Sequence, residues 1–415
     1  MVLAAMSAAQ QSSQPSAHEH MQHEHAGMVM NMPAAPVAQS ASGTSWIPAS
    51  SPLHMWMSTL GGWQLMAHGE LFVGYNQQGG PLGVGKVESQ NWLMLMQERK
   101  LGAATLQVRQ MLSAEPLTAP HPGYPELFQT GETYRGRALV NYQHPHDVFS
   151  ELSALLSVPV SEKVTWLLYG GPAGEPALGP AAFPHRISAS EDPAAPLGHH
   201  VQDSTHISYG VVTSGFVIDR FKIEASAFNG REPDERRYNF DLAALDSWSA
   251  RLNFAPGRNW AAQYSHGHLV HPEALEAGNV NRQTASLAYN RPWVAGNWAT
   301  TLIWGRNSKP ATRRVQNSYL LESTLNFARR NYAYTRLELV DKDELFPAAL
   351  NGVSYRIGAY TFGGVRDLAQ GRYGQIGLGA DIMFYSKPVA LDPVYGRDPV
   401  SVRIFLRFRP PAMKH

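Results

Sequence analysis

The sequence predicts an all-β fold: a closed antiparallel transmembrane β-barrel of about 16 strands with a disordered N-terminal segment. Three observations favour it: hydrophobicity with a period of two residues, connections that alternate between long and short, and an unusual composition. Charged residues make up 16% of the 415 residues, below the roughly 25% of ordinary soluble domains. The 36 Gly, 10 Trp, 17 Tyr and 15 Phe suit a lipid-facing barrel with aromatic girdles.

Apolar and polar residues alternate along segments of about ten residues. In one of them, Phe221, Ile223 and Ala225 share one face, while Lys222 and Glu224 share the other. One-sided alternation indicates a half-buried sheet, and about ten residues is the length with which a tilted strand crosses a bilayer. The predicted strands are 63–75, 90–98, 103–112, 147–157, 163–170, 205–217, 220–229, 246–255, 260–269, 281–290, 297–306, 316–327, 332–340, 353–363, 374–385 and 401–408.

The connections between these segments alternate in length along the chain. Short ones include 100–102 and 218–219, and long ones include 113–146 and 171–204. Short periplasmic turns and long extracellular loops are typical of outer-membrane barrels, and closure removes strand edges that an open sheet would have to protect. An even strand number places both termini in the periplasm. We therefore expect a bacterial outer-membrane protein that contacts outer-membrane lipid.

The chain divides into four parts by composition. Residues 1–10 end in small residues and are interpreted as a signal-peptide remnant. Residues 11–60 form a flexible His/Met-rich periplasmic segment, because a segment rich in Ala, Ser, Gln and Pro buries too little apolar surface to fold. The barrel covers 61–408, and 409–415 is a C-terminal tail. The chain has no Cys, which excludes disulfides and Cys nucleophiles, and its net charge of +1 gives no reason to expect nucleic acid as a partner.

A tract of histidines and methionines lies in the N-terminal segment. Imidazole binds divalent copper and zinc, whereas thioether sulfur selects monovalent copper, so the tract would hold copper in either oxidation state. The alternative is a low-complexity exported linker without a ligand. The candidate metal ligands are His18, His20, Met21, His23, His25, Met28, Met30 and Met32.

A second group of imidazoles and carboxylates comes from two long loops. Both loops precede strands that run from the extracellular to the periplasmic side, so these residues are expected at the extracellular rim, where they would bind a metal or gate a pore. The alternative is that they hydrogen-bond the folded loops to each other. The group comprises His144, His146, Asp147, His199, His200, Asp203 and His206.

Charged residues on the polar faces of the strands are expected to line the lumen. Mixed charges would create a field across a pore or pair with each other, and we favour pairing for most. The set is Lys222, Glu224, Arg251, Glu322, Arg336, Glu338, Arg356, Asp381, Arg403 and Arg407. Ser265–His266 and 204–206 place a hydroxyl near an imidazole, but neither implies the orienting group that a catalytic triad needs. We expect no enzymatic activity.

Two resemblances to known families follow from these residues. SAEPLT at 113–118, QHPHD at 143–147, PLGHH at 196–200 and FNGREP at 228–233 resemble runs of an uncharacterised bacterial outer-membrane β-barrel family, which implies the barrel rather than an activity. The His/Met tract resembles the N-terminal segment of copper-resistance outer-membrane (CopB-like) proteins. That resemblance implies a copper ion as the bound species and periplasmic copper proteins as partners.

The last strand also resembles a known signal. Apolar residues alternate over 402–408 and end on Phe408, as in the C-terminal insertion signal of bacterial outer-membrane proteins, although the tail beyond it departs from that pattern. The expected function is an outer-membrane channel or transporter connected with copper handling or resistance. The alternatives are a general porin or solute channel without a metal role and, third, an outer-membrane lipid hydrolase.

Overall fold

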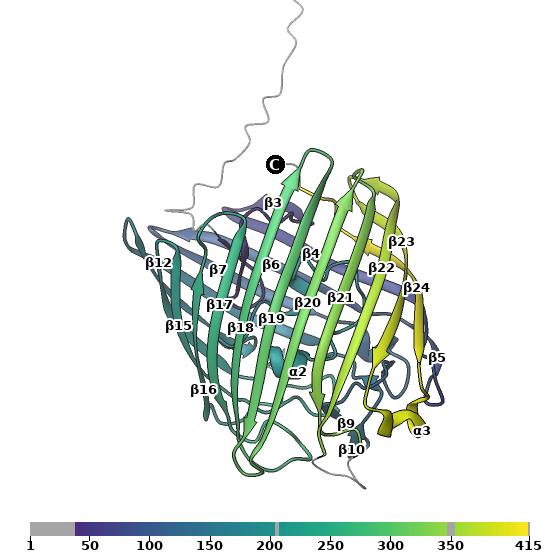
Figure 1. Cartoon of the computed structure of the whole chain (residues 1–415). Helices are drawn as coiled ribbons and strands as arrows, with labels where there is room; N and C mark the ends of the chain where they lie inside the picture. The colour runs from purple at the N-terminus through teal and green to yellow at the C-terminus, as the bar shows by residue number, and fades with distance from the viewer. Residues whose placement is uncertain (1–37, 204–206, 347–352, 414–415) are drawn as a thin grey trace, which may run out of the picture. The chain divides into compact units, whose positions relative to one another are not determined.

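The computed structural model describes residues 38–203, 207–346 and 353–413. All of them belong to the unit Ala34–His415, which the contacts separate from Met1–Pro33. Within these residues the long strands form a closed antiparallel barrel (Figure 1). None of the helices in the described ranges is long and apolar enough to cross a membrane. The predicted flexible segment of 11–60 is described only from residue 38 onward.

The barrel wall has sixteen strand positions. The long strand β4 pairs with β24 through 71–77 and with β3 through 63–67, so β3 continues the line of β24. On its other side β4 pairs with β5 and β6, which likewise share one position. The strands of the wall are β3 (Trp56–Leu60), β4 (Trp63–Gln77), β5 (Gly85–Glu88), β6 (Asn91–Leu101), β7 (Ala104–Leu112), β12 (Phe149–Ser161), β13 (Val164–Ala173), β14 (Val211–Ile218), β15 (Phe221–Phe228), β16 (Ser247–Phe254), β17 (Trp260–Leu269), β18 (Val280–Trp293), β19 (Gly296–Lys309), β20 (Arg314–Phe327), β21 (Asn331–Lys342), β22 (Tyr355–Gly371), β23 (Gly374–Ser386) and β24 (Val400–Arg409).

Each of the sixteen predicted segments overlaps one long strand of the wall, so the predicted fold class is confirmed. The connections alternate as expected, except that 310–313, between β19 and β20, is a short loop at the extracellular end. The remaining short elements lie in the loops and in the chain before β3. They are β1 (Ala38–Ser40), β2 (Trp46–Pro48), β8 (Tyr124–Pro125), β9 (Glu132–Tyr134), β10 (Arg137–Leu139), β11 (Tyr142–Gln143), α1 (Glu115–Thr118), α2 (His199–Gln202), α3 (Asp392–Tyr395) and the 3₁₀ turns η1 (Phe183–His185) and η2 (Val389–Leu391).

Alternation along the strands separates an apolar outside from a polar inside. In β15, Ile223 is 57% exposed on the outer face, whereas Lys222 and Glu224 are buried in the lumen. The aromatic and aliphatic residues that the pattern places outside include Trp248, Tyr319, Phe327, Ile376 and Phe384, all exposed; Phe254 stacks on exposed Phe221. Closure lets the backbone polar groups of all strands pair within the wall. The apolar outer face suits contact with lipid, and the polar face lines the interior. This is the fold of an outer-membrane β-barrel.

One residue of the expected lumen set lies on the other face. Arg356 is exposed and pairs with Asp341 through an Nε–Oδ1 distance of 2.9 Å. It has the same parity in β22 as exposed Phe362, while Ile357 and Ala359 face inward and are buried. Because Arg356 is near the extracellular end of its strand, its guanidinium can reach water there. The prediction that it lines the lumen is wrong.

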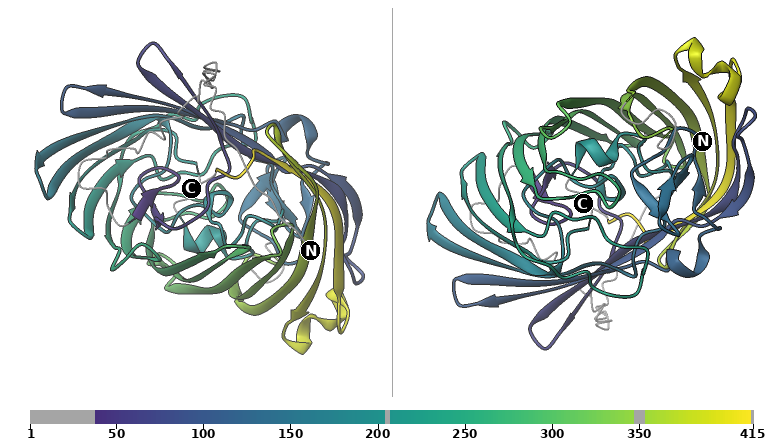
Figure 2. Two further views of the ribbon diagram at one scale, coloured as in Figure 1. Left: turned by 90° about the horizontal axis from the view of Figure 1, so that it is seen from above. Right: turned by 90° about the horizontal axis from the view of Figure 1, so that it is seen from below.

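The long loop between β13 and β14 folds back into the barrel, where Figure 2 shows coil segments within the ring of strands. We call its described part, residues 174–203, the inner loop. Its contacts follow the wall around: Ala177 donates its N–H to Ser226 of β15, Gly179 donates to Ser265 of β17, and Asp192 pairs with Arg403 of β24. The inner loop therefore crosses the lumen and is fastened on opposite sides.

The chain before β3 also packs in the lumen. Trp46 is buried against Ala255 and Val217 near the periplasmic turns, and the Thr44 carbonyl and hydroxyl accept hydrogen bonds from Lys222 and Arg251. Composition alone assigns residues 38–60 to the flexible segment. In the structure, a buried Trp and lumen charges hold this part of the chain in place. At the other end of the chain, Ala412 in the tail forms a bridge with His54.

Candidate metal centre

Histidines from two loops meet in the extracellular half of the lumen. His199 and His200 are the first two residues of α2 in the inner loop, and His144 follows β11 in the loop between β7 and β12. The carboxylate of Glu338 in β21 accepts the N–H groups of Leu197 and Gly198 at 3.0 and 3.1 Å. These two bonds fix the start of α2 against the wall.

Close packing against the wall also needs a glycine before α2. A Cβ at Gly198 would collide with the Ser318 hydroxyl of β20, so only glycine lets the backbone approach this strand. At the end of α2, Gln202 donates to the same Ser318 hydroxyl at 2.8 Å. The helix is thus held at both ends, and its two imidazoles point to the same region.

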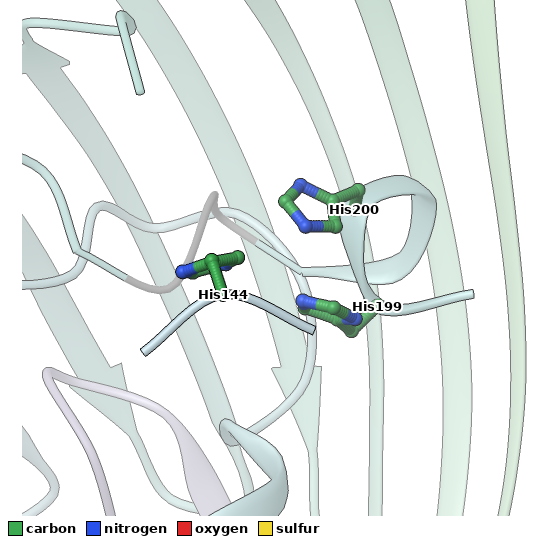
Figure 3. Close-up of side chains that lie close together, drawn as sticks. All are labelled: His144, His199 and His200. Carbon is green, nitrogen blue, oxygen red and sulfur yellow. The ribbon is translucent and has the colours of Figure 1, made fainter. Parts of the chain in front are cut away.

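The three imidazoles His144, His199 and His200 form the imidazole cluster (Figure 3). One ring nitrogen from each lies within 4.8 Å of the other two, and all three residues are buried. The His199 and His200 ring centroids are 4.1 Å apart, and those of His144 and His200 are 5.7 Å apart. A metal ion needs several ligand nitrogens that converge in this way.

Hydrogen bonds orient the rings of the cluster. His200 Nδ1 lies 2.9 Å from Glu232 Oε1, and His144 Nδ1 lies 3.1 Å from the Pro145 carbonyl. The Glu132 carboxylate lies close to the other ring nitrogen of His144, at 3.1 Å from Nε2. His199 Nδ1 is 2.6 Å from the Pro196 carbonyl. A carbonyl only accepts, so Nδ1 of His199 carries the proton and Nε2 carries the lone pair that a metal would use.

Buried carboxyl groups with raised pKa values surround the cluster. Burial, together with the Glu273 carboxylate, raises the pKa of Glu232 well above its ordinary value. Burial and the Glu344 carboxylate also raise the pKa of Glu273, to about 8. Carboxylates that repel one another in a desolvated site favour a cation between or beside them. Without a cation these groups hold protons at neutral pH, and a metal ion beside them would favour their ionised form.

The other residues of the predicted rim group are placed differently. The His146 ring lies 5.8 Å from that of His144, and its Nδ1 contacts Glu115 Oε2 at 2.9 Å. Burial lowers the pKa of His146, but Glu115 and Glu132 together raise it overall. Asp147 accepts from Tyr209 at 2.7 Å and from Arg237, and the Asp203 carbonyl accepts from Arg282. Asp147 and Asp203 therefore stabilise the loops through hydrogen bonds. His206 lies outside the described residues.

The sequence predicted that these residues lie at the extracellular rim. In the structure the cluster is buried instead of lying at an open mouth. Glu232 of the loop between β15 and β16 contacts His200, and the Gly131 backbone packs on the same ring. The neighbouring loops fold over the cluster because His200 and His144 offer them hydrogen-bond partners. The tract His18, His20, Met21, His23, His25, Met28, Met30 and Met32 lies outside the residues that the structure describes.

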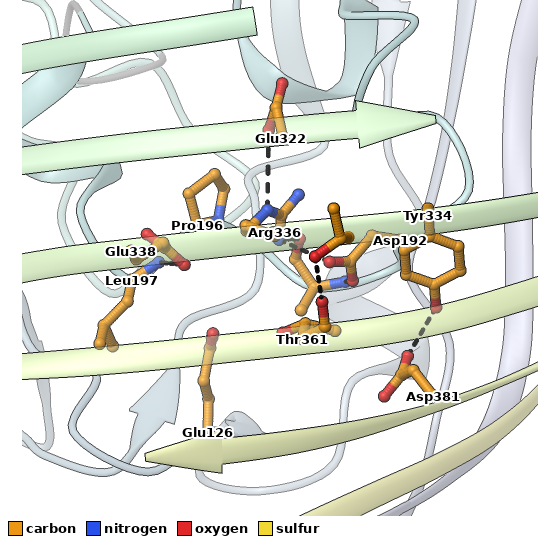
Figure 4. A network of polar contacts seen from close by, with 12 residues as sticks. Glu126, Asp192, Pro196, Leu197, Glu322, Tyr334, Arg336, Glu338, Thr361 and Asp381 are labelled. Carbon is orange, nitrogen blue, oxygen red and sulfur yellow. Dashed lines mark hydrogen bonds and ion pairs between the residues drawn. The ribbon is translucent and has the colours of Figure 1, made fainter. Parts of the chain in front are cut away.

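Most lumen charges pair, many of them with the inner loop (Figure 4). Asp192 bridges Arg336 of β21 and Arg403 of β24, each at 3.0 Å. Asp381 of β23 pairs with Arg403 at 3.0 Å and accepts from Tyr334 at 2.7 Å. The inner-loop partners were not predicted from the sequence. Their only signal was a short charged stretch, 186–192, within a loop rich in Ala and Pro.

The hydroxyl and imidazole of Ser265–His266 do not face each other. Ser265 is buried on the lumen side of β17, whereas the His266 ring lies on the outer face, 5.5 Å from the Trp248 ring. Neighbouring residues of a strand point to opposite faces. This pair therefore cannot act as a catalytic dyad.

The chain matches no family model, and no curated protein matches it. Similar solved structures include an anion-selective porin from Comamonas acidovorans, with a TM-score of 0.49, 10% identity, and coverage of 84% of this chain and 99% of the porin. OmpT, an outer-membrane protein of Vibrio cholerae, gives 0.48, 8%, 85% and 99%. OmpF of Salmonella typhi in complex with daunomycin gives 0.46, 8%, 85% and 100%. The likeness to copper-resistance proteins finds no support here.

Proposed function

We propose that this barrel is an outer-membrane transport protein for a transition-metal ion, copper first, which it binds inside the lumen at the imidazole cluster. The observation that carries the proposal is the convergence of His144, His199 and His200, with one nitrogen of each within 4.8 Å of the others in a buried setting. Imidazole suits divalent copper and zinc. Three protein ligands would leave a further position for water or an incoming ligand.

The second sphere of the cluster supports this proposal. A metal-binding imidazole usually gives its other N–H to a carboxylate or a backbone carbonyl, which fixes the ring and its tautomer. His200 has such a partner in Glu232, and His199 has one in the Pro196 carbonyl. A purely structural role would need hydrogen bonds but not the convergence of three ring nitrogens.

The N-terminal tract would serve the same ion on the periplasmic side. Its imidazole and thioether groups suit copper in either oxidation state, and periplasmic copper proteins would be the exchange partners. Copper is the cargo in this proposal, and no resident cofactor is implied.

A general solute channel is the alternative, favoured by the polar lumen. The inner loop argues against this alternative, because it is fastened to strands on opposite sides of the barrel. Two lumen cavities lined by described residues have volumes of about 70 and 30 Å³, whereas a site for a small organic molecule takes roughly 300–1,000 Å³. Passage of hydrated solutes would require the inner loop to move.

Metal titration of the full chain tests the proposal. The parent variant carries Ala at His18, His20, His23 and His25, so that the tract cannot mask the lumen. Titration with Zn²⁺ should give one bound ion, which is lost when His199 and His200 become Ala. His266→Ala is the matched control, because this imidazole lies on the outer face.

An unchanged zinc stoichiometry in the His199→Ala/His200→Ala variant would overturn the metal proposal. Planar-bilayer conductance with and without Cu²⁺ then decides the alternative. A stable open conductance that is indifferent to copper would favour the general solute channel.

A further inference from the structure

A second set of metal-binding side chains lines the lumen face of β4, β6 and β7. The inward residues of these strands include Met66 and His68 of β4, Met94 of β6 and Met111 of β7; Met66 and Met94 are buried, and Met111 lines a lumen cavity. In the strand register, His68 is opposite Met94 and Met94 is opposite Met111. Directly opposite residues have Cβ atoms about 4.5–5.5 Å apart, so these side chains form one patch, which we call the thioether patch.

Two imidazoles meet the thioethers of this patch. His68 Nε2 lies 3.0 Å from Met94 Sδ. His185, from the 3₁₀ turn η1 of the inner loop, brings its ring to 5.5 Å from the His68 ring. The Trp92 ring packs against both, at 5.1 and 4.8 Å. The patch therefore combines residues of the wall with one from the inner loop.

His185 has an unused ligand atom. The residue is only 8% exposed, and its Nε2 has no hydrogen-bond partner among the residues that the structure describes. A buried polar atom without a partner destabilises the folded protein. An ion that takes this nitrogen as a ligand would remove that cost.

We infer that Met94, Met111, His68 and His185 bind a soft monovalent metal ion, Cu⁺ or its analogue Ag⁺. Thioether sulfur prefers this class of ion, whereas hard divalent ions prefer carboxylate and water oxygen. Met96, on the same face, is opposite Arg109 in the register, and a guanidinium so close disfavours a divalent charge more than a monovalent one. The inference deepens the proposed function, on which it rests, by assigning the reduced ion a lumen site of its own.

One lumen cavity borders the thioether patch and extends to His146, which neighbours the imidazole cluster. Its lining includes Trp92, Met111 and His185 of the thioether patch, and also His146, whose ring lies 5.8 Å from that of His144 in the imidazole cluster. The carboxylates of Glu115, Glu126 and Glu175 line the same cavity. The cavity therefore offers oxygen ligands to a cation between the thioether patch and His146.

Silver titration of the full chain tests the inference, because Ag⁺ needs no reductant. The parent variant has Ala at the four tract histidines and Leu at Met21, Met28, Met30 and Met32. Met94→Leu/Met111→Leu removes two sulfurs at nearly constant volume. Met383→Leu is the matched control, since Met383 is a buried lumen methionine of β23.

We expect the Ag⁺ affinity to fall at least tenfold in Met94→Leu/Met111→Leu and to stay unchanged in Met383→Leu. X-ray absorption should show sulfur neighbours of silver in the parent that the double variant lacks. Quenching of tryptophan fluorescence by Ag⁺ should shrink when Trp92 becomes Phe. Each variant is first checked for barrel folding by circular dichroism.

The two proposals fail in different ways. Unchanged Ag⁺ binding in Met94→Leu/Met111→Leu, with zinc binding still dependent on His199 and His200, would overturn the thioether site and leave the proposed function standing. Failure of the parent to bind either Zn²⁺ or Ag⁺ would overturn both. Loss of Ag⁺ binding in the double variant, with zinc binding retained, supports both.

Discussion

Arg186 of the inner loop and Glu322 of β20, 136 residues apart in the chain, form a buried two-point ion pair. Arg186 Nε lies 2.5 Å from Glu322 Oε1, and Nη2 lies 3.1 Å from Oε2. Ser188 donates to the same carboxylate at 2.8 Å. Planar bidentate pairs of this kind fix orientation as well as distance, so this pair is a main attachment of the inner loop to the wall.

Arg186→Met should destabilise the barrel and loosen the inner loop. In this variant the buried Glu322 keeps a longer contact with Arg336 Nε, at 3.6 Å. The cost should therefore stay below the cost of about 3–5 kcal/mol for a fully uncompensated buried charge. Denaturant unfolding in detergent should show that loss, and planar bilayers should show more frequent conductance. The double variant Arg186→Met/Glu322→Leu should recover most of the stability; if it is as unstable as the single variant, the pair does not hold the loop.

Glu232→Gln should weaken zinc binding at the imidazole cluster. The Glu232 carboxylate orients His200 through its Nδ1, and loss of such a partner costs roughly 10–100-fold in metal affinity. Glu235→Gln is the control in the same loop, because Glu235 accepts from Thr133 and Gly136 instead. Equal zinc affinities in the two variants would argue against a role for Glu232 in the site.

Leu252→Arg and Leu378→Arg should each destabilise the barrel by about 2–4 kcal/mol, with the larger values toward the bilayer midplane. Both leucines are exposed on the outer face of their strands. Leu275→Arg is the control, since Leu275 is exposed in an extracellular loop. The measurement is reversible unfolding in lipid vesicles, and a cost for Leu275→Arg equal to that of the strand variants would contradict the assigned membrane span.

The barrel should lose stability as the pH rises toward 8 because of Glu126. Burial, and more weakly the Glu338 carboxylate, raises the pKa of Glu126 to about 8, against about 4.3 for an unperturbed Glu. The folded protein therefore keeps a proton that the unfolded chain loses. Stability is full below the unfolded pKa and falls as the pH approaches 8. In Glu126→Gln the unfolding temperature should drop less between pH 5 and pH 9, and an identical drop would refute this assignment.

The wall could be predicted because its rule is local. Along β15 and β23 every second residue faces lipid, and that alternation is visible in the sequence without knowledge of the partner strands. Arg356 shows the limit at a strand end, where a charged side chain on the outer face reaches water. Residues 38–60 show a second limit of prediction from the sequence, because they are held in place by lumen charges far along the chain.

The sites depend on contacts that no local pattern reveals. His144 and His199 could be grouped because both loops precede strands of the same direction. The thioether patch was not predicted because it depends on the register of the strands. His68 lies opposite Met94 in only one pairing of β4 with β6. A shift of one residue would move every methionine of the patch to the lipid face. Its signal was the shared parity of the methionines in neighbouring strands.

The pairing of β4 with β24 sets an order for assembly. Residues 71–77 meet 402–408, so this seam cannot form until the whole wall has been synthesised, and distant pairings of this kind form slowly. After the seam has closed, the inner loop can enter the lumen only through the extracellular opening, because the paired strands leave no gap in the wall. A chain delayed at this stage would present two unpaired strand edges, which invite pairing with another chain. Closure of this one seam is thus a step on which biogenesis of the whole barrel depends.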